Sequence, residues 1–141
     1  MFYNTADLAI LKEELEFIDT AIIPLQHIDM TKEARAHANN IELNQMIVMQ
    51  VERQLRGRLF ITPSVSVINN DLTQAFHYRT QLLDYGFKHV VFLCDKSFDI
   101  NDNVLEFNQI PLESMSQDMK LEMANEEVKK VMQAIIRLWN S

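Results

Sequence analysis

The chain has 141 residues, of which 48% are hydrophobic and 23% are charged, and its 20 Asp and Glu outnumber its 13 Lys and Arg to give a formal net charge of −7. This length is that of one domain, and the composition is that of a folded globular protein rather than a disordered one. An acidic surface repels phosphate backbones and anionic lipids, so we expect neither nucleic acid nor a membrane as a partner.

The sequence also argues against export and membrane insertion. The single cysteine, Cys94, cannot form an internal disulfide, and residues 1–10 lack the basic region and the apolar run of a signal peptide. No apolar run approaches the roughly 20 residues that a membrane-spanning helix needs. We therefore predict a cytoplasmic protein that folds as one domain over residues 1–141.

The first two segments change from helical to strand spacing. Leu8, Leu11 and Leu15 recur at intervals of three and four residues, which predicts a short amphipathic helix over residues 5–16. Residues 17–25 form a nearly continuous apolar run with several β-branched residues. Such a run is typical of a strand that is covered on both faces.

A long helix and an interrupted strand are predicted next. Residues 31–56 carry an apolar stripe at four-residue spacing, and Gly57 is placed to end the helix. The stripe consists of Leu43, Ile47, Val51 and Leu55. Residues 58–67 predict a second strand, in which Pro63 marks either the end of the strand or a bulge at a sheet edge.

A third helix and a third strand follow. Asp71 and Gln74 have the spacing of a capping box, with Asp in place of Ser, and they predict a helix that runs to Tyr85. Gly86 is placed to end that helix. Residues 89–94, with the sequence HVVFLC, predict the most completely buried strand of the chain.

The last part of the chain predicts a short strand and a long helix. Residues 104–110 predict a fourth strand, and Ser114 with Gln117 predicts the capped start of a C-terminal helix. Residues 95–103 are too few and too polar for a packed crossover helix. The fourth strand therefore either pairs antiparallel or reaches a parallel position through an extended loop.

The alternation of apolar strands and amphipathic helices predicts the α/β class. Long helical crossovers between apolar strands favour a three-layer fold with a mostly parallel central sheet of about four strands flanked by helices. Such a sheet is Rossmann-like or flavodoxin-like, and here it carries a long C-terminal helix.

The sequence lacks the motifs of phosphate-binding loops and of common zinc sites. The only two glycines, Gly57 and Gly86, follow helices, whereas a phosphate-binding loop places several glycines between a strand and a helix. The four histidines lack the His-Glu-x-x-His spacing, and one cysteine cannot build a thiolate zinc site. We therefore expect no cofactor and no metal.

Polar residues that follow the strands are the candidates for a ligand site. In open parallel sheets, ligands bind beyond the carboxyl ends of the strands, where the strand order reverses. If the first and third strands are neighbours there, the polar residues around these strand ends converge. The ligand-binding candidates are His27, Asp29, Ser64, Cys94, Asp95 and Arg58.

These candidates have structural interpretations as well. Cys94 with His27 and Asp29 could form a nucleophile, a base and an orienting acid, but an unpaired Cys in an apolar strand is usually a small buried hydrophobe. Asp95 could be a catalytic acid or could cap the next turn. Arg58, near the end of the second predicted helix, could bind an anion or offset the helix dipole, and the structural role is favoured. No catalytic residue is assigned.

A methionine-rich segment is the candidate for an interaction surface. Met115, Met119 and Met123 fall at or near the start of the C-terminal helix, among charged neighbours. Flexible thioethers fill gaps in protein cores, and they also suit adaptable binding surfaces. A partly exposed row of methionines at a helix start predicts a protein-docking face.

Residues 18–25, with the sequence IDTAIIPL, and residues 51–59, with the sequence VERQLRGRL, resemble the YpiF-like family of short uncharacterised proteins of Gram-positive bacteria. The resemblance implies a bacterial cytosolic protein. It brings no activity, cofactor or catalytic residue with it.

Two functions from different classes stay open. The first is a non-enzymatic protein-binding or regulatory domain that binds another protein or a second copy of itself through the C-terminal helical segment, and it is favoured because no catalytic constellation stands out. The second is a small-molecule-binding protein or enzyme whose site lies at the carboxyl ends of the strands.

Overall fold

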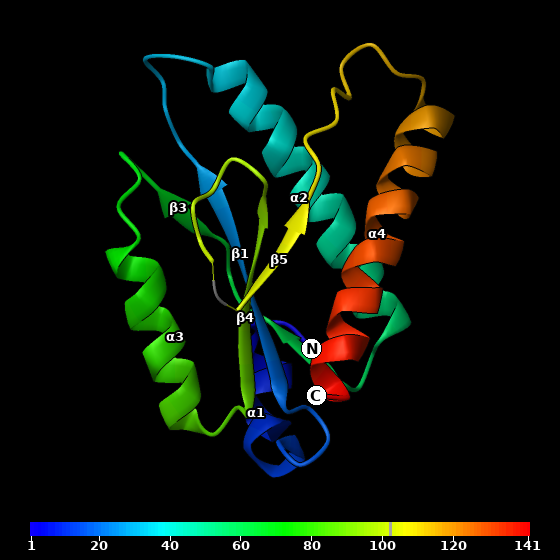
Figure 1. The fold of residues 1–141 in the computed structure, drawn as a ribbon. Helices are drawn as coiled ribbons and strands as arrows, with labels where there is room; N and C mark the ends of the chain where they lie inside the picture. The colour runs from blue at the N-terminus through cyan, green and yellow to red at the C-terminus, as the bar shows by residue number, and fades with distance from the viewer. Residues whose placement is uncertain (102) are drawn as a thin grey trace.

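The computed structural model of the protein describes residues 1–101 and 103–141, and Figure 1 shows their arrangement. In chain order the elements are α1 (Thr5–Glu14), β1 (Thr20–His27), α2 (Ala34–Gln54), β2 (Leu59–Ile61), β3 (Val65–Val67), α3 (Thr73–Tyr85), β4 (His89–Asp95), β5 (Val104–Phe107) and α4 (Gln117–Trp139).

The strands form one parallel sheet in the order β2-β1-β4-β5, with β3 also paired to β1. The predicted α/β class is therefore confirmed. Because β3 continues the path of β2, the order corresponds to the first four strands of the flavodoxin-like order, in which strand order reverses between β1 and its neighbour β4. The fourth predicted strand, β5, pairs parallel to β4, so the extended-loop alternative is the correct one.

Helices cover both faces of the sheet (Figure 1). Side chains alternate along β1, so Ile22 packs against α2 and α4, whereas Ile23 packs on the side of α1 and α3. Both isoleucines are at most 1% exposed. This burial on two faces explains why the apolar run of β1 is continuous rather than alternating.

The second predicted strand is split by Pro63. Thr62 to Ser64 separate β2 from β3, and both short strands pair parallel with β1 in succession. Proline lacks a backbone N–H, so the ladder is broken where the exposed Pro63 lies.

Two of the predicted helix caps are wrong. Helix α4 is capped by Ser116, whose side chain accepts a hydrogen bond from the backbone N–H of Met119, and not by Ser114. Helix α3 begins after Leu72, and Asp71 instead accepts hydrogen bonds from the backbone N–H and the hydroxyl of Thr73. In α4 a second serine two residues further on makes the capping bond, because side-chain oxygens compete for the same free N–H groups, whereas in α3 the N-cap residue Leu72 has no side chain that can cap the helix. Gly57 and Gly86 adopt φ of 89° and 130°, as expected for glycines that follow helices.

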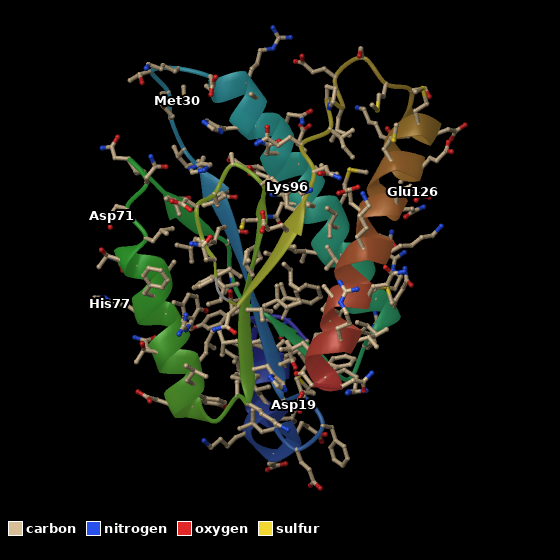
Figure 2. The ribbon with its side chains drawn as sticks, in the orientation of Figure 1. Asp19, Met30, Asp71, His77, Lys96 and Glu126 are labelled. Carbon is tan, nitrogen blue, oxygen red and sulfur yellow. The ribbon has the colours of Figure 1, made fainter. Side chains whose placement is uncertain are left out.

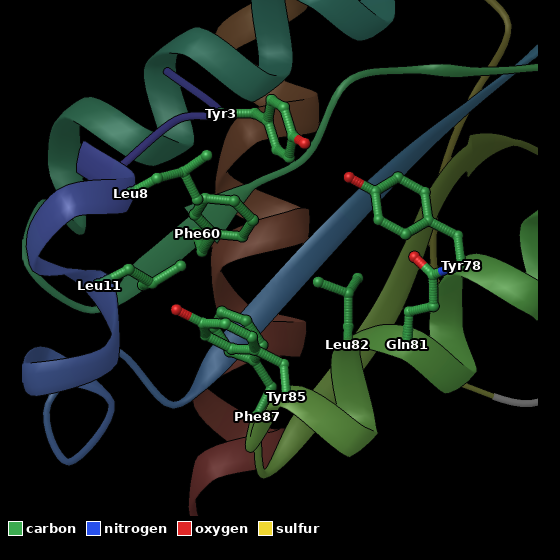
Figure 3. A pocket seen from close by; sticks show the side chains of 9 residues that line it. All are labelled: Tyr3, Leu8, Leu11, Phe60, Tyr78, Gln81, Leu82, Tyr85 and Phe87. Atoms are coloured by element: carbon green, nitrogen blue, oxygen red, sulfur yellow. The ribbon is translucent and has the colours of Figure 1, made fainter. Parts of the chain in front are cut away.

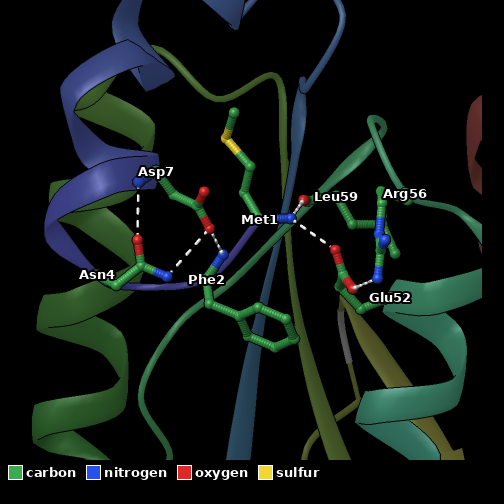
Figure 4. A network of polar contacts seen from close by, with 7 residues as sticks. All are labelled: Met1, Phe2, Asn4, Asp7, Glu52, Arg56 and Leu59. Atoms are coloured by element: carbon green, nitrogen blue, oxygen red, sulfur yellow. Dashed lines mark hydrogen bonds and ion pairs between the residues drawn. The ribbon is translucent and has the colours of Figure 1, made fainter.

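Buried carboxylates tie the helices to the sheet. Glu52 on α2, which is 4% exposed, accepts a hydrogen bond from the Met1 ammonium at 3.0 Å, and Arg56 lies 3.7 Å away (Figure 4). Glu127 on α4 accepts from the backbone N–H of Asn108 at 2.7 Å and pairs with Lys130 at 3.0 Å. Burial alone would raise the pKa of Glu127, but these two partners together lower it below the usual value.

Candidate functional site

The carboxyl ends of β1 and β4 lie side by side, as the sheet order requires. In Figure 2, Met30, which follows β1, lies at the opposite end of the sheet from Asp19, which precedes it. His27 is the last residue of β1, and its ring stacks on Phe98 with centroids 3.7 Å apart and planes 9° apart. His37 on α2 lies on another side of His27, with ring centroids 5.2 Å apart.

The His27 side chain packs against its neighbours as an uncharged ring. Burial lowers the pKa of His27, the Asp95 carboxylate partly opposes this shift, and His37 adds to it. The imidazole is therefore uncharged near neutral pH. No hydrogen bond joins His27 to Asp95 in the part of the chain that the structure describes, so the two do not form an oriented acid and base pair.

Asp95 organises the loops at this edge. It is 2% exposed, and its Oδ1 accepts hydrogen bonds from the backbone N–H of Ser97 at 2.9 Å and from Gln109 Nε2 at 3.0 Å. The Ser97 hydroxyl donates to the same oxygen. These bonds tie the loop after β4 to the loop after β5, which is the turn-capping interpretation of Asp95.

Among the described residues, Asp29 and Ser64 make no hydrogen bond with His27 or Asp95. Asp29 accepts hydrogen bonds from Thr31 and Lys32, and the Thr31 hydroxyl and the backbone N–H groups lower the pKa of Asp29. Ser64 is exposed in the link between β2 and β3.

Arg58 does not lie at the predicted edge. It precedes β2 and therefore belongs to the amino ends of the strands, where its guanidinium lies over the Trp139 ring at 3.8 Å from the centroid. Trp139 Nε1 in turn donates to Thr20 Oγ1 at 2.8 Å. The cation thus holds the end of α4 against the sheet.

Cys94 is 0% exposed in β4. Burial, with smaller contributions from Asp95 and Glu106, raises the pKa of the Cys94 thiol to about 12. A thiol with this pKa stays protonated at neutral pH and is a poor nucleophile.

We therefore expect the folded protein to resist alkylation of Cys94 by iodoacetamide at pH 8. The thiol should react at the rate of a free cysteine once the chain is unfolded in urea. Mass spectrometry of timed samples measures both rates. Rapid labelling of the folded chain would contradict a buried, protonated Cys94.

No group of three or more His, Cys, Asp or Glu suited to a metal ion occurs among residues 1–101 and 103–141. None of the helices in these ranges is both long enough and apolar enough to cross a membrane.

A groove of about 590 Å³ runs between α2 and α4 on the opposite side of these helices from the sheet. Met49 on α2 and Leu121 on α4 face it, with exposed fractions of 49% and 44%. Met46 and Ala124 also line it, with amide side chains around them. Met49 and Leu121 lie outside the buried stripes of the two helices, whereas Ala124 belongs to the core and Met46 packs against it. The position of Met49 and Leu121 off the stripes is the sequence signal that could have indicated a groove.

The predicted methionine face is divided. Met119 and Met123, 48% and 38% exposed, lie one turn apart on α4, whereas Met115 packs against the core. Met119 and Leu121 are two residues apart, and such residues point to different sides of a helix. The exposed methionines therefore flank the groove and do not line it.

The comparisons with known proteins agree with the sequence resemblance. A model of the family described as "Protein of unknown function (DUF2487)" matches residues 10–139. The chain belongs to the DUF2487 family. It is similar to the uncharacterized protein YpiF of Bacillus subtilis (strain 168), with 28% identity over 132 residues that cover 89% of each chain. The expected resemblance to YpiF-like proteins is thus confirmed, and no solved structure matches the chain.

The DUF2487 match extends over both walls of the groove and over the carboxyl edge of the sheet, because α2, α4, β1 and β4 all lie within residues 10–139. The family is described as one of unknown function. Family membership therefore leaves the function of these surfaces to be inferred from their chemistry.

Proposed function

We propose that this member of DUF2487 is a non-enzymatic regulatory protein of the cytoplasm that binds an amphipathic helix of another protein in the groove between α2 and α4. The exposed Met49 and Leu121, which face the groove from its two walls, are the observation that carries the proposal. Two neighbouring helices with apolar side chains accept the apolar face of a third helix, whose anchors recur at i, i+3 or i+4, and i+7.

The charges around the groove favour an acidic partner helix. In a chain with a net charge of −7, the groove is lined by two cations, Arg53 and Lys120, and one acid, Glu42. Acidic residues on the flanks of a bound helix would pair with the two cations. Such pairs at the rim would set orientation and association rate more than affinity.

The alternative, a small-molecule site at the carboxyl edge, has less support. Three donors already bond to Oδ1 of Asp95, and a pKa of about 12 makes the Cys94 thiol a poor nucleophile. The edge is better explained as a set of loop contacts.

The proposal is tested by cross-linking from the groove itself. A photoreactive phenylalanine is placed at Leu121 or at Met49, and the protein is irradiated in extract of its own cells. We expect both positions to trap the same partner through the same helical peptide. A position far from the groove, Met30, which is 85% exposed, serves as the control and should trap nothing in common.

The trapped peptide is then synthesised and titrated by calorimetry. Leu121→Glu should weaken its binding by about 10-fold or more, since a buried leucine contributes about 1.5–3 kcal/mol. Met30→Glu should leave binding unchanged. Different cross-linked partners at the two groove positions, or a peptide that binds Leu121→Glu as tightly as wild type, would contradict the proposal.

A further inference from the structure

A second concave site lies on the other face of the sheet, between α1 and α3. It has a volume of about 420 Å³ and opens between the two helices above β2 (Figure 3). Three of its lining residues, Leu11, Phe60 and Phe87, are each at most 3% exposed. The pocket is separate from the groove, because α1 and α3 cover the opposite face of the sheet from α2 and α4.

Flat aromatic rings form one continuous wall of this pocket. The Phe60 and Phe87 rings are stacked with centroids 5.5 Å apart, and Tyr85 stacks on Phe87 at 5.9 Å. All three rings line the pocket, and Lys12 Nζ lies over the Tyr85 ring at 4.5 Å from its centroid. Such a wall favours another aromatic ring, which can stack in an offset or edge-to-face arrangement.

Two tyrosine hydroxyl groups meet at one end of the pocket. Figure 3 shows the hydroxyl groups of Tyr3 and Tyr78 pointing toward one another there, the Gln81 amide below the Tyr78 ring, and the Tyr85 hydroxyl at the other end beside Leu11. Burial raises the pKa of Tyr78, so this hydroxyl keeps its proton and remains a hydrogen-bond donor. None of the described residues that line the pocket carries a charge near neutral pH.

We propose that this pocket binds a neutral, planar bicyclic aromatic compound with one hydrogen-bonding group. The volume of 420 Å³ is almost three times that of a cavity of about 150 Å³ that accommodates benzene, so two fused rings with a substituent fit. The lining residues carry no charge, and the neighbouring Lys12 ammonium is already held by the carbonyl oxygen and the ring of Tyr85, so the pocket favours a neutral compound. The hydroxyls of Tyr3 and Tyr78 receive the polar substituent.

The α1 wall is held in place without a ligand. At its start, Asn4 caps the helix through a hydrogen bond from the Asp7 backbone N–H at 2.7 Å, and Asp7 accepts from the Phe2 N–H at 2.8 Å (Figure 4). At the other end, Lys12 donates to the Tyr85 carbonyl oxygen at 2.7 Å and thereby bridges α1 to α3. A pocket with fixed walls loses little conformational entropy when a ligand enters.

The probe for the test is 2-naphthol, which is neutral, planar and bicyclic. Its binding to the whole chain is measured by calorimetry, and its position is mapped by amide chemical shifts. We expect micromolar to millimolar binding with shifts that centre on Phe60, Tyr85 and Phe87. The saturated, puckered analogue decahydro-2-naphthol should bind at least several-fold more weakly, because it cannot stack.

Two variants on α1 provide a matched pair. Leu8→Trp fills the pocket and should weaken 2-naphthol binding by about 10-fold or more, whereas Ile10→Trp, at a position that is 46% exposed and outside the pocket, should not change it. Tyr78→Phe removes one hydroxyl and should weaken binding by about 3- to 10-fold, the range of a single neutral hydrogen bond. Circular dichroism checks that each variant is folded.

Wild-type protein that shows no saturable binding of 2-naphthol at millimolar concentration would overturn the proposal. So would shifts that centre on α2 and α4, or equal binding of the planar and the puckered compound. Because the probe and the variants lie on the face away from the groove, these results do not depend on whether a partner helix binds there.

Discussion

Replacing Phe92 with Ala is expected to lower the free energy of unfolding by about 3–5 kcal/mol, the range for a fully buried phenylalanine. Phe92 is 0% exposed in β4, one of the two central strands, and its ring meets that of Phe76 on α3 edge to face at a centroid distance of 5.9 Å. Removing the phenyl ring leaves a cavity. The cavity cannot close, because β4 is held in place by backbone pairing with β1 and β5. Urea denaturation followed by circular dichroism measures the loss.

The same substitution at an exposed phenylalanine is the control. Phe17, between α1 and β1, is 60% exposed, and Phe17→Ala should change the free energy of unfolding by no more than about 0.5 kcal/mol. Equal losses for the two variants would show that the β4 core is not packed as described.

Asn44→Ala is expected to destabilise the fold by about 2–4 kcal/mol. Asn44 on α2 is 4% exposed, and its Nδ2 donates to the carbonyl oxygens of Leu25 at 3.2 Å and Leu93 at 3.1 Å. One amide thus links the helix to the ends of β1 and β4. Its loss removes hydrogen bonds from two buried acceptors, each of which costs about 1–3 kcal/mol when left unsatisfied.

The neighbouring Gln45→Ala variant is the control, because Gln45 is exposed and alanine favours the helix. Asn44→Asp should be more harmful than Asn44→Ala at neutral pH, since a carboxylate would face two carbonyl oxygens and its folded-state pKa would be raised. That extra loss should shrink as the pH falls and the carboxyl group gains a proton that it can donate. An Asn44→Ala variant as stable as Gln45→Ala would refute the linking role.

The apolar runs were sufficient to predict the layers of this fold. The apolar runs of β1 and β4 are continuous because both faces of the sheet are covered, and the predicted stripe of α2 lies on the face that is buried. The direction of β5 could not be predicted from sequence, because the polar segment before it carries no helical or turn pattern that distinguishes the two orientations. The direction of β5 is determined by its pairing with β4, and such pairing depends on contacts between residues that are distant in the sequence.

The sites were harder to predict than the layers. The proximity of the strand ends followed from the parallel sheet. The hydrogen bond from Gln109 to Asp95 could not be predicted, because it joins two loops that only the tertiary structure brings together. Arg58 was assigned to the wrong edge of the sheet. It directly precedes β2 and therefore lies at the amino end of that strand, and the boundary between a helix and the next strand cannot be predicted from sequence to within one or two residues. The pocket between α1 and α3 combines Tyr3 with Tyr78 and Tyr85 from a distant helix. The one sequence signal of this pocket is the spacing of Tyr78, Leu82 and Tyr85, which places these three residues on the same face of α3.

Met1 forms backbone hydrogen bonds with the edge strand β2, and these bonds affect whether two molecules of this protein can pair through their sheets. The backbone N–H of Ile61 donates to the Met1 carbonyl oxygen at 2.8 Å, and the Met1 ammonium donates to the Leu59 carbonyl oxygen at 2.8 Å. The outer rim of β2 is thereby occupied, and Pro63 interrupts the rim immediately beyond it. A strand from a neighbouring molecule finds no run of free amides there to extend the sheet, which guards this side against edge-to-edge aggregation.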